Sequence, residues 1–235
     1  MKPLMDVVIL SKASTDELRL MTQRCIDSAV RGAPGQSLNV IVMEQVPDIT
    51  YQHATTVEMT EPFAYNRFAN LGAKYGEAEW IMVANNDLYF EHDWLAPMLA
   101  ANHGVMSPRD PRHHRQRLVK SNTVGDQIGL YFSGWCFVIR RTLWEKIGGF
   151  DEDFTFWCAD DAVVQQVRRA GVTPMLISSS RVHHFGSVTH DQIPEGTEER
   201  TWEQVYKFEQ KYRVPKFQGH RGYQRWKIQR ARQGR

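Results

Sequence analysis

The 235-residue sequence contains few cysteines and no long hydrophobic run. Its three cysteines, Cys25, Cys136 and Cys158, are odd in number and far apart, which argues against a disulfide framework and favours a reducing compartment. No stretch approaches the roughly 20 apolar residues of a membrane-spanning helix. The apolar run near the N-terminus is too short for a signal peptide, and no small-residue cleavage site follows it. We therefore expect a protein of the cytoplasm with no membrane span.

A large excess of charge is also missing, since the formal net charge is only +2, but the charges are unevenly placed. Residues 206–235 contain ten Lys or Arg and one Glu, a net charge of +9, which leaves −7 for the first 205 residues. Five aromatic residues are interleaved with these cations: Tyr206, Tyr212, Phe217, Tyr223 and Trp226. Such a mixture suits a polyanion, through phosphate contacts and base stacking. A basic C-terminal extension that binds a nucleic acid is therefore one prediction, and one that binds an anionic membrane is the alternative.

Hydrophobic periodicity predicts an α/β domain. Residues 6–10 and 39–43 are short β-branched runs typical of buried strands, and a capping sequence at 14–17 starts an apolar helical face between them. Strand, helix and strand in close succession form a βαβ unit, which predicts a parallel sheet. Ligands of such sheets bind at the carboxyl ends of the strands, so Ser11 and Glu44 are candidate binding residues.

The same patterns predict elements along the rest of the chain. Strands are expected at 55–59, 79–84, 104–107, in two segments within 129–140, and at 173–177 and 180–184, and helices at 63–75, 92–101, 142–147, after 160 and at 198–212. Asn85, Asn86 and Asp87 directly follow the strand at 79–84. A carboxylate at this position can meet a metal or a diphosphate, although an Asn-rich turn is the simpler interpretation.

Residues 108–120 interrupt this alternation of strands and helices with a cluster of cations: Arg109, Arg112, Arg115, Arg117 and Lys120. Only Asp110 opposes them. A solvated loop and a phosphate-contacting loop both fit this composition.

The stretch 148–171 opens with a Gly-Gly turn, carries five acidic residues between 151 and 161, and then becomes helical. Asp160 and Asp161 lie where the loop enters the helix. They either satisfy the free N–H groups of the first turn, or one of them is a general base in a cleft whose rim carries Trp157. Tandem His183 and His184, at the end of a predicted strand, suit either a structural role or a metal or phosphate site.

Segments in one order along residues 5–190 resemble the family-2 glycosyltransferases of GT-A fold. They are VVILS, VIVMEQ, YNRFANLGAKYGEAEWIMVANND, SGWCFVIRRTLWEKIGGFDEDF, CADDAVVQQVRRAG and VHHFGS. The specificity lies in their order and spacing, since no single motif would suffice. The resemblance implies a mixed, mostly parallel central sheet flanked by helices, here with a basic C-terminal extension.

The resemblance also implies roles for individual residues. Glu44 would hold the nucleoside, Asp87 is the remaining carboxylate of the metal-binding DxD position, and Asp160 lies at the position of the catalytic base. His183 lies at the histidine of the family's H-x-x-G pattern, so Asp87 and His183 are the candidate ligands of Mn²⁺ or Mg²⁺. The candidate donor-binding residues are Ser11, Glu44, Asn66, Arg67, Asn85, Asn86, Asp87 and Trp135.

Two departures from the family pattern leave questions open. Ala159 replaces an acidic residue, so either Asp160 or Asp161 can be the catalytic base. Asn85 and Asn86 occupy the first two positions of DxD, which lowers the negative charge that a hard divalent cation prefers.

The implied reaction is inverting transfer of a hexosyl or pentosyl group from a nucleotide sugar, with a UDP-sugar expected first, to an acceptor hydroxyl. Trp157 and the cations of the 108–120 loop are candidate acceptor-binding residues. They favour a polyanionic acceptor such as a hydroxymethylated base in DNA, as in small phage-type DNA glycosyltransferases, which work in the host cytoplasm. The alternatives are a cell-surface polysaccharide, a lipid-linked glycan, or a non-catalytic nucleotide-binding module. Residues 1–190 are predicted to form the glycosyltransferase domain, and 191–235 a C-terminal helix and basic tail.

Overall fold

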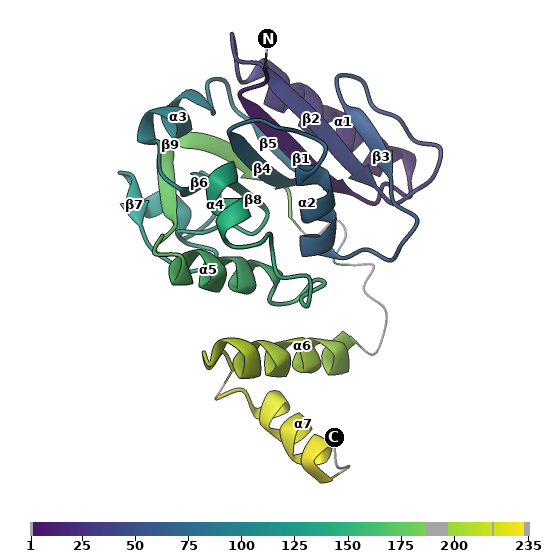
Figure 1. Ribbon diagram of the computed structural model, residues 1–235, viewed down its shortest axis with the longest axis vertical. Coiled ribbons are helices and arrows are strands. Elements are labelled where there is room, and N and C mark those ends of the chain that lie inside the picture. Colours follow the sequence, from purple (N-terminus) through teal and green to yellow (C-terminus); the bar gives the residue numbers. More distant parts are fainter. Residues whose placement is uncertain (1, 187–196, 218, 233–235) are drawn as a thin grey trace.

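The structure, a computed structural model, describes residues 2–186, 197–217 and 219–232 (Figure 1). Its strands are β1 (Met5–Ser11), β2 (Leu38–Glu44), β3 (Thr55–Glu58), β4 (Trp80–Asn85), β5 (Leu88–Phe90), β6 (Val105–Arg109), β7 (Thr123–Val124), β8 (Cys136–Arg140) and β9 (Met175–His184). Its helices are α1 (Asp16–Arg31), α2 (Tyr65–Ala73), α3 (Ala96–Ala101), α4 (Arg141–Lys146), α5 (Ala159–Arg169), α6 (Thr197–Tyr212) and α7 (Arg221–Arg232), with a 3-10 turn η1 (Gln116–Leu118).

The strands form one sheet in the order β3-β2-β1-β4-β8-β6-β9-β5, with β7 also paired to β9. The first four strands of this order are parallel, and β8 is antiparallel to both β4 and β6. Since β8 is antiparallel to both neighbours, β6 runs in the same direction as β4. Strand β9 is parallel to β6 and therefore runs in that direction too. The expected mixed, mostly parallel sheet is therefore confirmed.

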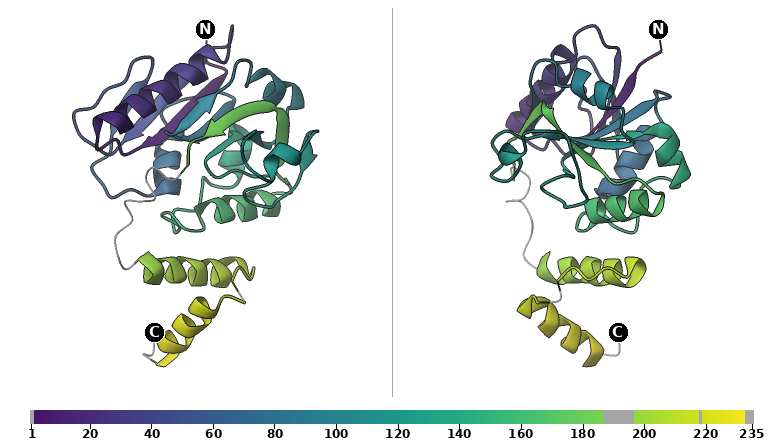
Figure 2. Two further views of the ribbon diagram at one scale, coloured as in Figure 1. Left: turned by 180° about the vertical axis from the view of Figure 1, so that it is seen from behind. Right: turned by 90° about the vertical axis from the view of Figure 1, so that its left-hand side faces the viewer.

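Side-chain alternation along the central strands makes two cores. Val7 and Ile9 of β1 lie in one cluster with Ile26 of α1, whereas Val8 and Leu10 lie in the other with residues of α2 and α5. Successive side chains of a strand point to opposite faces, so a fully apolar strand is buried by helices on both sides. Figure 2 shows α1 on one face of the sheet and α2, α4 and α5 on the other.

The C-terminal residues form two helices that pack below α5 (Figure 1). A third hydrophobic cluster joins Phe154, Ala159 and Ala162 to Trp202, Val205 and Phe208 of α6 and to Tyr223 and Trp226 of α7. Tyr212 is 5% exposed and Tyr223 fully buried, so these aromatic rings are core residues. The idea that they stack on nucleic-acid bases is wrong for these two rings, because both are buried within this cluster.

Several local expectations are corrected. The predicted strands at 173–177 and 180–184 are the single ten-residue strand β9, and 129–135 is a loop before β8. The helix expected at 92–101 is shorter, because residues 92–95 form a turn and α3 begins only at Ala96. Beyond residue 215, α7 replaces the expected tail. None of the helices in the described part of the chain is long and apolar enough to span a membrane.

Candidate active site

The carboxyl ends of β1, β2 and β4 meet at one edge of the sheet. The pairing register places Ser11 beside Glu44 and Leu10 beside Asn85. The predicted candidates at these strand ends are therefore neighbours. Their side chains, however, have different hydrogen-bond partners. These partners show which side chains only stabilise the fold and which can bind a ligand.

Asn86 stabilises this edge of the sheet through buried hydrogen bonds. Its side-chain Nδ2 donates to Thr22 Oγ1 at 2.9 Å and to Ser11 Oγ at 3.2 Å, and its side chain is almost fully buried. Ser11 and Thr22 lie within 3.3 Å of each other. Buried polar groups need such partners, so this cluster fixes the turn after β4 to β1 and α1. Asn86 thus sets the position of the next residue, Asp87.

Glu44 is completely buried, and the protein uses both of its carboxylate oxygens. Oε1 accepts from the backbone N–H groups of Ala13 and Val46 at 3.0 and 2.9 Å, and Oε2 accepts from the Tyr51 hydroxyl at 2.8 Å. Burial and the neighbouring carboxylate raise the pKa of Tyr51 to about 12, so the phenol stays a donor. In this arrangement Glu44 holds the loop after β2 rather than offering a free oxygen to a nucleoside.

Asp87 has the opposite character. It is 3% exposed, yet among the described residues its Oδ1 has no hydrogen-bond partner. Its Oδ2 lies 3.4 Å from His184 Nε2, and its carbonyl accepts from the N–H of Phe185 at 3.0 Å. The indole of Trp135 stacks on the His184 ring, with centroids 5.1 Å apart and planes 14° from parallel. A buried carboxylate oxygen without a protein donor is able to bind a cation or accept from a water.

The two adjacent histidines take different partners because they lie on a strand. His184 pairs in register with Leu88 and contacts Asp87, whereas His183 pairs with Tyr89 and bonds to Glu91 at 2.7 Å. Successive side chains of β9 point to opposite faces of the sheet. The structure therefore brings His184, and not the predicted His183, to the carboxylate of Asp87.

The residues around Asp87 fit a divalent cation that is coordinated partly by the protein and partly by a diphosphate. Among the described residues, no group of three or more His, Cys, Asp or Glu side chains is arranged to hold a metal alone. Asp87 and His184 supply one carboxylate with an unpaired oxygen and one imidazole. Mg²⁺ and similar ions are commonly held by one or two protein groups together with substrate phosphates and water. The donor set thus fits an ion that arrives with a phosphorylated ligand.

Asp160 lies in the first turn of α5, beside the turn before β8. A Cβ built at Gly134 would lie 2.8 Å from Asp160 Cβ and 2.9 Å from its Oδ2, so the carboxylate occupies the space that this glycine leaves free. The Tyr65 hydroxyl donates to the carbonyl of Gly134. Burial raises the pKa of Asp160, and the Lys216 ammonium partly opposes that effect. A carboxylate with a raised pKa is suited to accept a proton.

Asp161 forms an ion pair. Its Oδ2 contacts the ammonium of Lys216, which lies between α6 and α7. Asp160 Oδ1 accepts from the N–H of Asp161 at 2.9 Å, and Oδ2 faces Gly134. Of the two aspartates, Asp160 is therefore the one that reaches the turn at 134–135. Ala159, where the resembled family has an acid, is 3% exposed within the third cluster, so a carboxylate there would be buried among aromatic rings.

Gly134 and Trp135 lie between Asp87 and Asp160. Gly134 contacts Asp160, and Trp135 stacks on the histidine that contacts Asp87. The carbonyl of Trp135 also accepts from the N–H of Asn85 at 2.9 Å, which ties this turn to the end of β4. A carboxylate suited to a cation and a carboxylate suited to a proton therefore flank one short turn.

The basic loop is built around two buried polar residues. Gln116 accepts from the N–H of Asp110 at 2.8 Å and donates to Ser133 Oγ at 2.8 Å, so it joins the loop to the segment before Gly134. Asp110 accepts from the N–H groups of Arg112 and His184, at 2.8 and 3.4 Å. The loop is thereby attached to the site through β9, which the composition of 108–120 did not reveal.

The five cations of this loop have different environments. Arg109 donates to the carbonyl of Val119 at 3.0 Å and holds the loop together. Arg112 donates to the carbonyl of His184 at 3.2 Å and lies over the Phe185 ring at 5.0 Å, so it flanks the Asp87 end of the site. Within the described chain, Arg115, Arg117 and Lys120 form no ion pair with a carboxylate, and the last two are exposed. Arg112 is therefore a loop cation that contacts the candidate cation site, through the carbonyl of His184.

Three further candidates lie at the margins of the site. Asn66 is fully buried and donates to the carbonyls of Asp151 and Ala159 at 2.9 and 3.3 Å, so it holds the loop that leads to α5. Arg67 pairs at the surface with Glu61 and Glu152. Trp157 is partly exposed and packs edge-on against Phe156, itself 50% exposed, just before Asp160.

Sequence reasoning missed Tyr65, Lys216 and the role of His184. Tyr65 lies at the first position of α2, and burial followed by the charge of Asp160 raises its pKa well above the ordinary value. Lys216 was counted only as one of the tail cations. The tandem histidines were a usable signal for His184, since adjacent strand residues cannot both face the same side.

Comparison of the sequence with models of known protein families and with curated proteins finds no match. Solved structures are nevertheless similar. One is the mannosyltransferase PcManGT from Pyrobaculum calidifontis in complex with GDP-Man and Mn²⁺, with a TM-score of 0.62 and 18% identity over 92% of this chain and 66% of that one. This chain thus spans somewhat less than two thirds of the mannosyltransferase.

A second similar structure is a mutant of Drosophila β-1,4-galactosyltransferase 7 in complex with manganese, UDP-Gal and xylobiose. Its TM-score is 0.55, with 17% identity over 84% of this chain and 78% of that one. At these identities the likeness concerns the fold. The chain therefore has the GT-A fold, a mixed and mostly parallel sheet flanked by helices, that these two glycosyltransferases share.

Proposed function

We propose that this protein is an inverting, metal-dependent glycosyltransferase that moves a hexosyl or pentosyl group from a nucleotide sugar to an acceptor hydroxyl. The observation that carries the proposal is the pair Asp87 and Asp160 on the two sides of the turn at Gly134 and Trp135. Asp87, with an unpaired buried oxygen, is suited to a cation on the donor diphosphate. Asp160, whose pKa burial raises, is suited to the acceptor proton.

The donor end of the site holds the nucleotide sugar. Asp87 and His184 would ligate the divalent ion, and Trp135 keeps the imidazole in place by stacking on it. When bound, Mn²⁺ or Mg²⁺ neutralises the charge that grows on the departing diphosphate. Arg112, beside His184, adds a fixed positive charge at the same end. Both similar structures are complexes with manganese and a nucleotide sugar, which supports this donor class.

The acceptor end removes a proton. Asp160 accepts the proton of the acceptor hydroxyl as that oxygen attacks the anomeric carbon from the side opposite the diphosphate. This single displacement inverts the configuration at that carbon. General-base catalysis of this kind contributes about 10²–10⁴-fold. Phe156 and Trp157, at the start of α5, offer aromatic faces on which a sugar or a base can pack.

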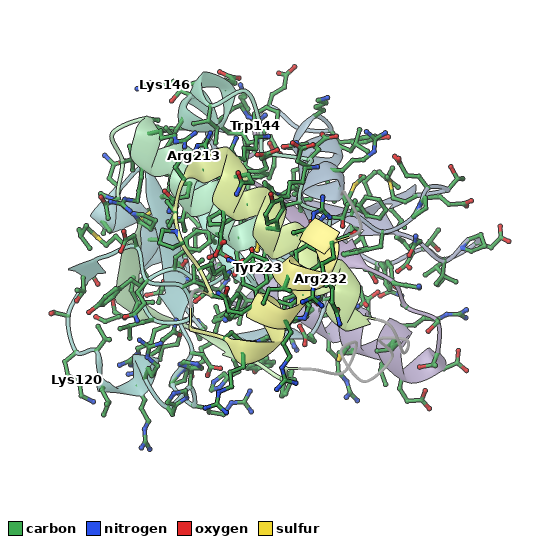
Figure 3. The ribbon with its side chains drawn as sticks, turned by 90° about the horizontal axis from the view of Figure 1, so that it is seen from below. Lys120, Trp144, Lys146, Arg213, Tyr223 and Arg232 are labelled. Atoms are coloured by element: carbon green, nitrogen blue, oxygen red, sulfur yellow. The ribbon has the colours of Figure 1, made fainter. Side chains whose placement is uncertain are left out.

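The acceptor is proposed to be polyanionic. On α7, Arg221, Arg225 and Arg232 are exposed on the face opposite the buried Tyr223 and Trp226, and in the described part of the chain none of the three pairs with a carboxylate. Their spacing of four and seven residues keeps them on one stripe of the helix, about 16 Å long. In Figure 3, Lys120 lies at one edge of the molecule and Arg232 near the centre of the view, so these two cations of the loop and of α7 lie apart.

The first acceptor to test is duplex DNA that contains hydroxymethylated bases, incubated with a panel of nucleotide sugars and Mn²⁺. Unmodified DNA and a donor-only mixture are the controls, and the Asp160→Asn variant marks background. Label in hydroxymethylated DNA alone would support a DNA glycosyltransferase. Donor hydrolysis without labelled DNA would keep the transferase and turn the search to anionic glycans and lipid-linked acceptors. Nucleotide binding with no turnover in any mixture would contradict the proposal and favour a binding module.

A further inference from the structure

Lys216 occupies a fixed position between the two C-terminal helices. The backbone N–H of Lys216 donates to Glu209 Oε1 at 2.8 Å, and the backbone N–H of Phe217 donates to the same oxygen at 3.2 Å. The other oxygen of Glu209 accepts from the Tyr223 hydroxyl at 2.9 Å. One carboxylate on α6 therefore binds both the connecting segment and α7, so the backbone that carries Lys216 is held from two sides.

The helices on either side of Lys216 belong to a cluster that packs on α5. Val205 and Phe208 of α6 are 1% exposed and lie in one cluster with Ala159 and Ala162 of α5. Phe154 and Phe208 meet edge to face, with centroids 5.9 Å apart. This apolar contact places the segment at 216 directly against the first turn of α5.

The Lys216 ammonium contacts Asp161 Oδ2, with side chains that are 28% and 15% exposed. Its charge also lowers the pKa of the neighbouring Asp160, against the effect of burial. Two adjacent carboxylates without a cation would repel each other, and one of them would take up a proton more readily. Lys216 removes that competition by pairing with the second carboxylate.

We propose that Lys216 is a positioning residue of the active site: by pairing with Asp161 it leaves Asp160 as the single free carboxylate at the start of α5. The two C-terminal helices, where the sequence predicted one helix and a basic tail, thereby become one wall of the site. The inference rests on the proposed function for its catalytic meaning, but the electrostatic coupling can be measured without turnover.

The groups that face Asp160 come from three parts of the fold. Tyr65 of α2 lies behind Gly134, and Lys216 lies on the C-terminal side. The remaining titratable neighbours are on or next to its own helix, namely Cys158 and Asp161. Burial raises the pKa of Cys158 to about 11 and raises the pKa of Tyr65 well above its ordinary value, so both stay neutral through the acidic and neutral range. Lys216 and Asp161 are therefore the charged neighbours that set the titration of Asp160.

The test compares Lys216→Met with Lys211→Met. Methionine keeps the unbranched apolar stem near Phe208 and removes only the charge. Lys211 is a matched control, because it pairs with Asp151 and Asp153 at 2.7 and 2.8 Å in the same C-terminal segment but lies away from Asp160. The base must be deprotonated, so the rate falls as the pH drops through the pKa of Asp160. Loss of the ammonium raises that pKa, and the acidic limb of kcat/KM should move up by about 1 pH unit.

Two further variants separate charge from packing. Lys216→Arg should return the limb to its original position. The double variant Lys216→Met with Asp161→Asn removes both members of the pair and should also move the limb most of the way back. A limb that stays in place in Lys216→Met, while thermal stability falls as in Lys211→Met, would overturn the proposal and leave Lys216 as a structural ion pair.

Carboxyl titration by NMR on protein labelled with ¹³C at aspartate gives the same answer without substrate. The Asp160 resonance, assigned with Asp160→Asn, should titrate at a higher pH in Lys216→Met and not in Lys211→Met. If the protein transferred no sugar, this shift would still establish the coupling while the proposed function failed. An unchanged titration in a protein that does transfer sugar would reject the coupling alone.

Discussion

The two aspartates of the site differ in what surrounds them. Asp87 follows a buried strand, and its carboxylate lies next to an imidazole with one oxygen unpaired. Asp160 begins a helix and lies against a glycine, near a neutral phenol and a cation. A strand end that offers an unused oxygen is suited to a ligand cation, whereas a buried carboxyl group whose pKa is raised by that burial is suited to a proton. The same type of side chain is thus suited to cation binding at Asp87 and to proton transfer at Asp160.

The difference predicts that the two carboxylates can be lost independently. Removing Asp160 should stop the chemistry and spare donor binding, whereas removing Asp87 should weaken donor binding itself. A protein in which both changes had the same effect would not have the divided site described above.

The largest expected effect is that of Asp160→Asn. The amide cannot accept the acceptor proton, so turnover should fall by about 10²–10⁴-fold. Donor affinity with Mn²⁺, measured by calorimetry, should stay within about threefold, because Asp160 lies on the other side of the Trp135 turn. Asp161→Asn is the matched control and should lower turnover far less. The reverse order of the two variants would identify Asp161 as the base.

Next in size is Asp87→Asn, with a turnover loss of about 10²-fold, since charge stabilisation by a metal amounts to several kcal/mol. Here Mn²⁺-dependent donor binding should fall too. The tandem histidines provide a matched pair, because His184 contacts Asp87 and His183 bonds to Glu91. His184→Gln should weaken Mn²⁺-dependent binding, and His183→Gln should not. Equal effects of the two histidine variants would contradict the assignment of His184 as a ligand.

Much of the fold followed from sequence because its evidence is local. The strands β1, β2 and β4 are continuous apolar runs, and the capping sequence at 14–17 is visible in four residues. Within it, Thr15 accepts from the N–H of Leu18 at 3.3 Å. Asp160 was also within reach, since it lies at the start of a helix with clear periodicity. Interactions between residues close in sequence leave such patterns.

The rest depended on contacts between distant segments. Nothing in the C-terminal composition shows that Tyr223 is buried, because the surface that covers it comes from residues 154–162 and from α6. Likewise Glu44 resembles a nucleoside ligand until Tyr51 and two backbone N–H groups are seen on its oxygens. The choice between His183 and His184 required the register of β5 against β9.

A smaller effect is expected when the turn between the two aspartates is disturbed. The Cβ of Gly134→Ala would lie 2.8 Å from Asp160 Cβ, so the carboxylate must shift by a fraction of an ångström. We expect kcat to fall about tenfold with KM for the donor little changed, because a small misplacement of a reacting group is costly. Gly219→Ala, where an added Cβ meets nothing within 4 Å, is the control. Unchanged kcat in Gly134→Ala would show that Asp160 does not need its present position.

The smallest effect on catalysis is expected from Glu44→Gln, which should instead lower stability. Glutamine keeps one acceptor oxygen for the two backbone N–H groups, but its amide N–H₂ cannot accept the proton of the Tyr51 hydroxyl. Leaving a buried donor unsatisfied costs about 1–3 kcal/mol, which urea denaturation can measure. Glu58→Gln is the control, because Glu58 pairs in register with Glu44 on β3 but is exposed. If Glu44→Gln weakened donor binding strongly and left stability unchanged, Glu44 would have to exchange its internal bonds for the nucleoside when the donor binds.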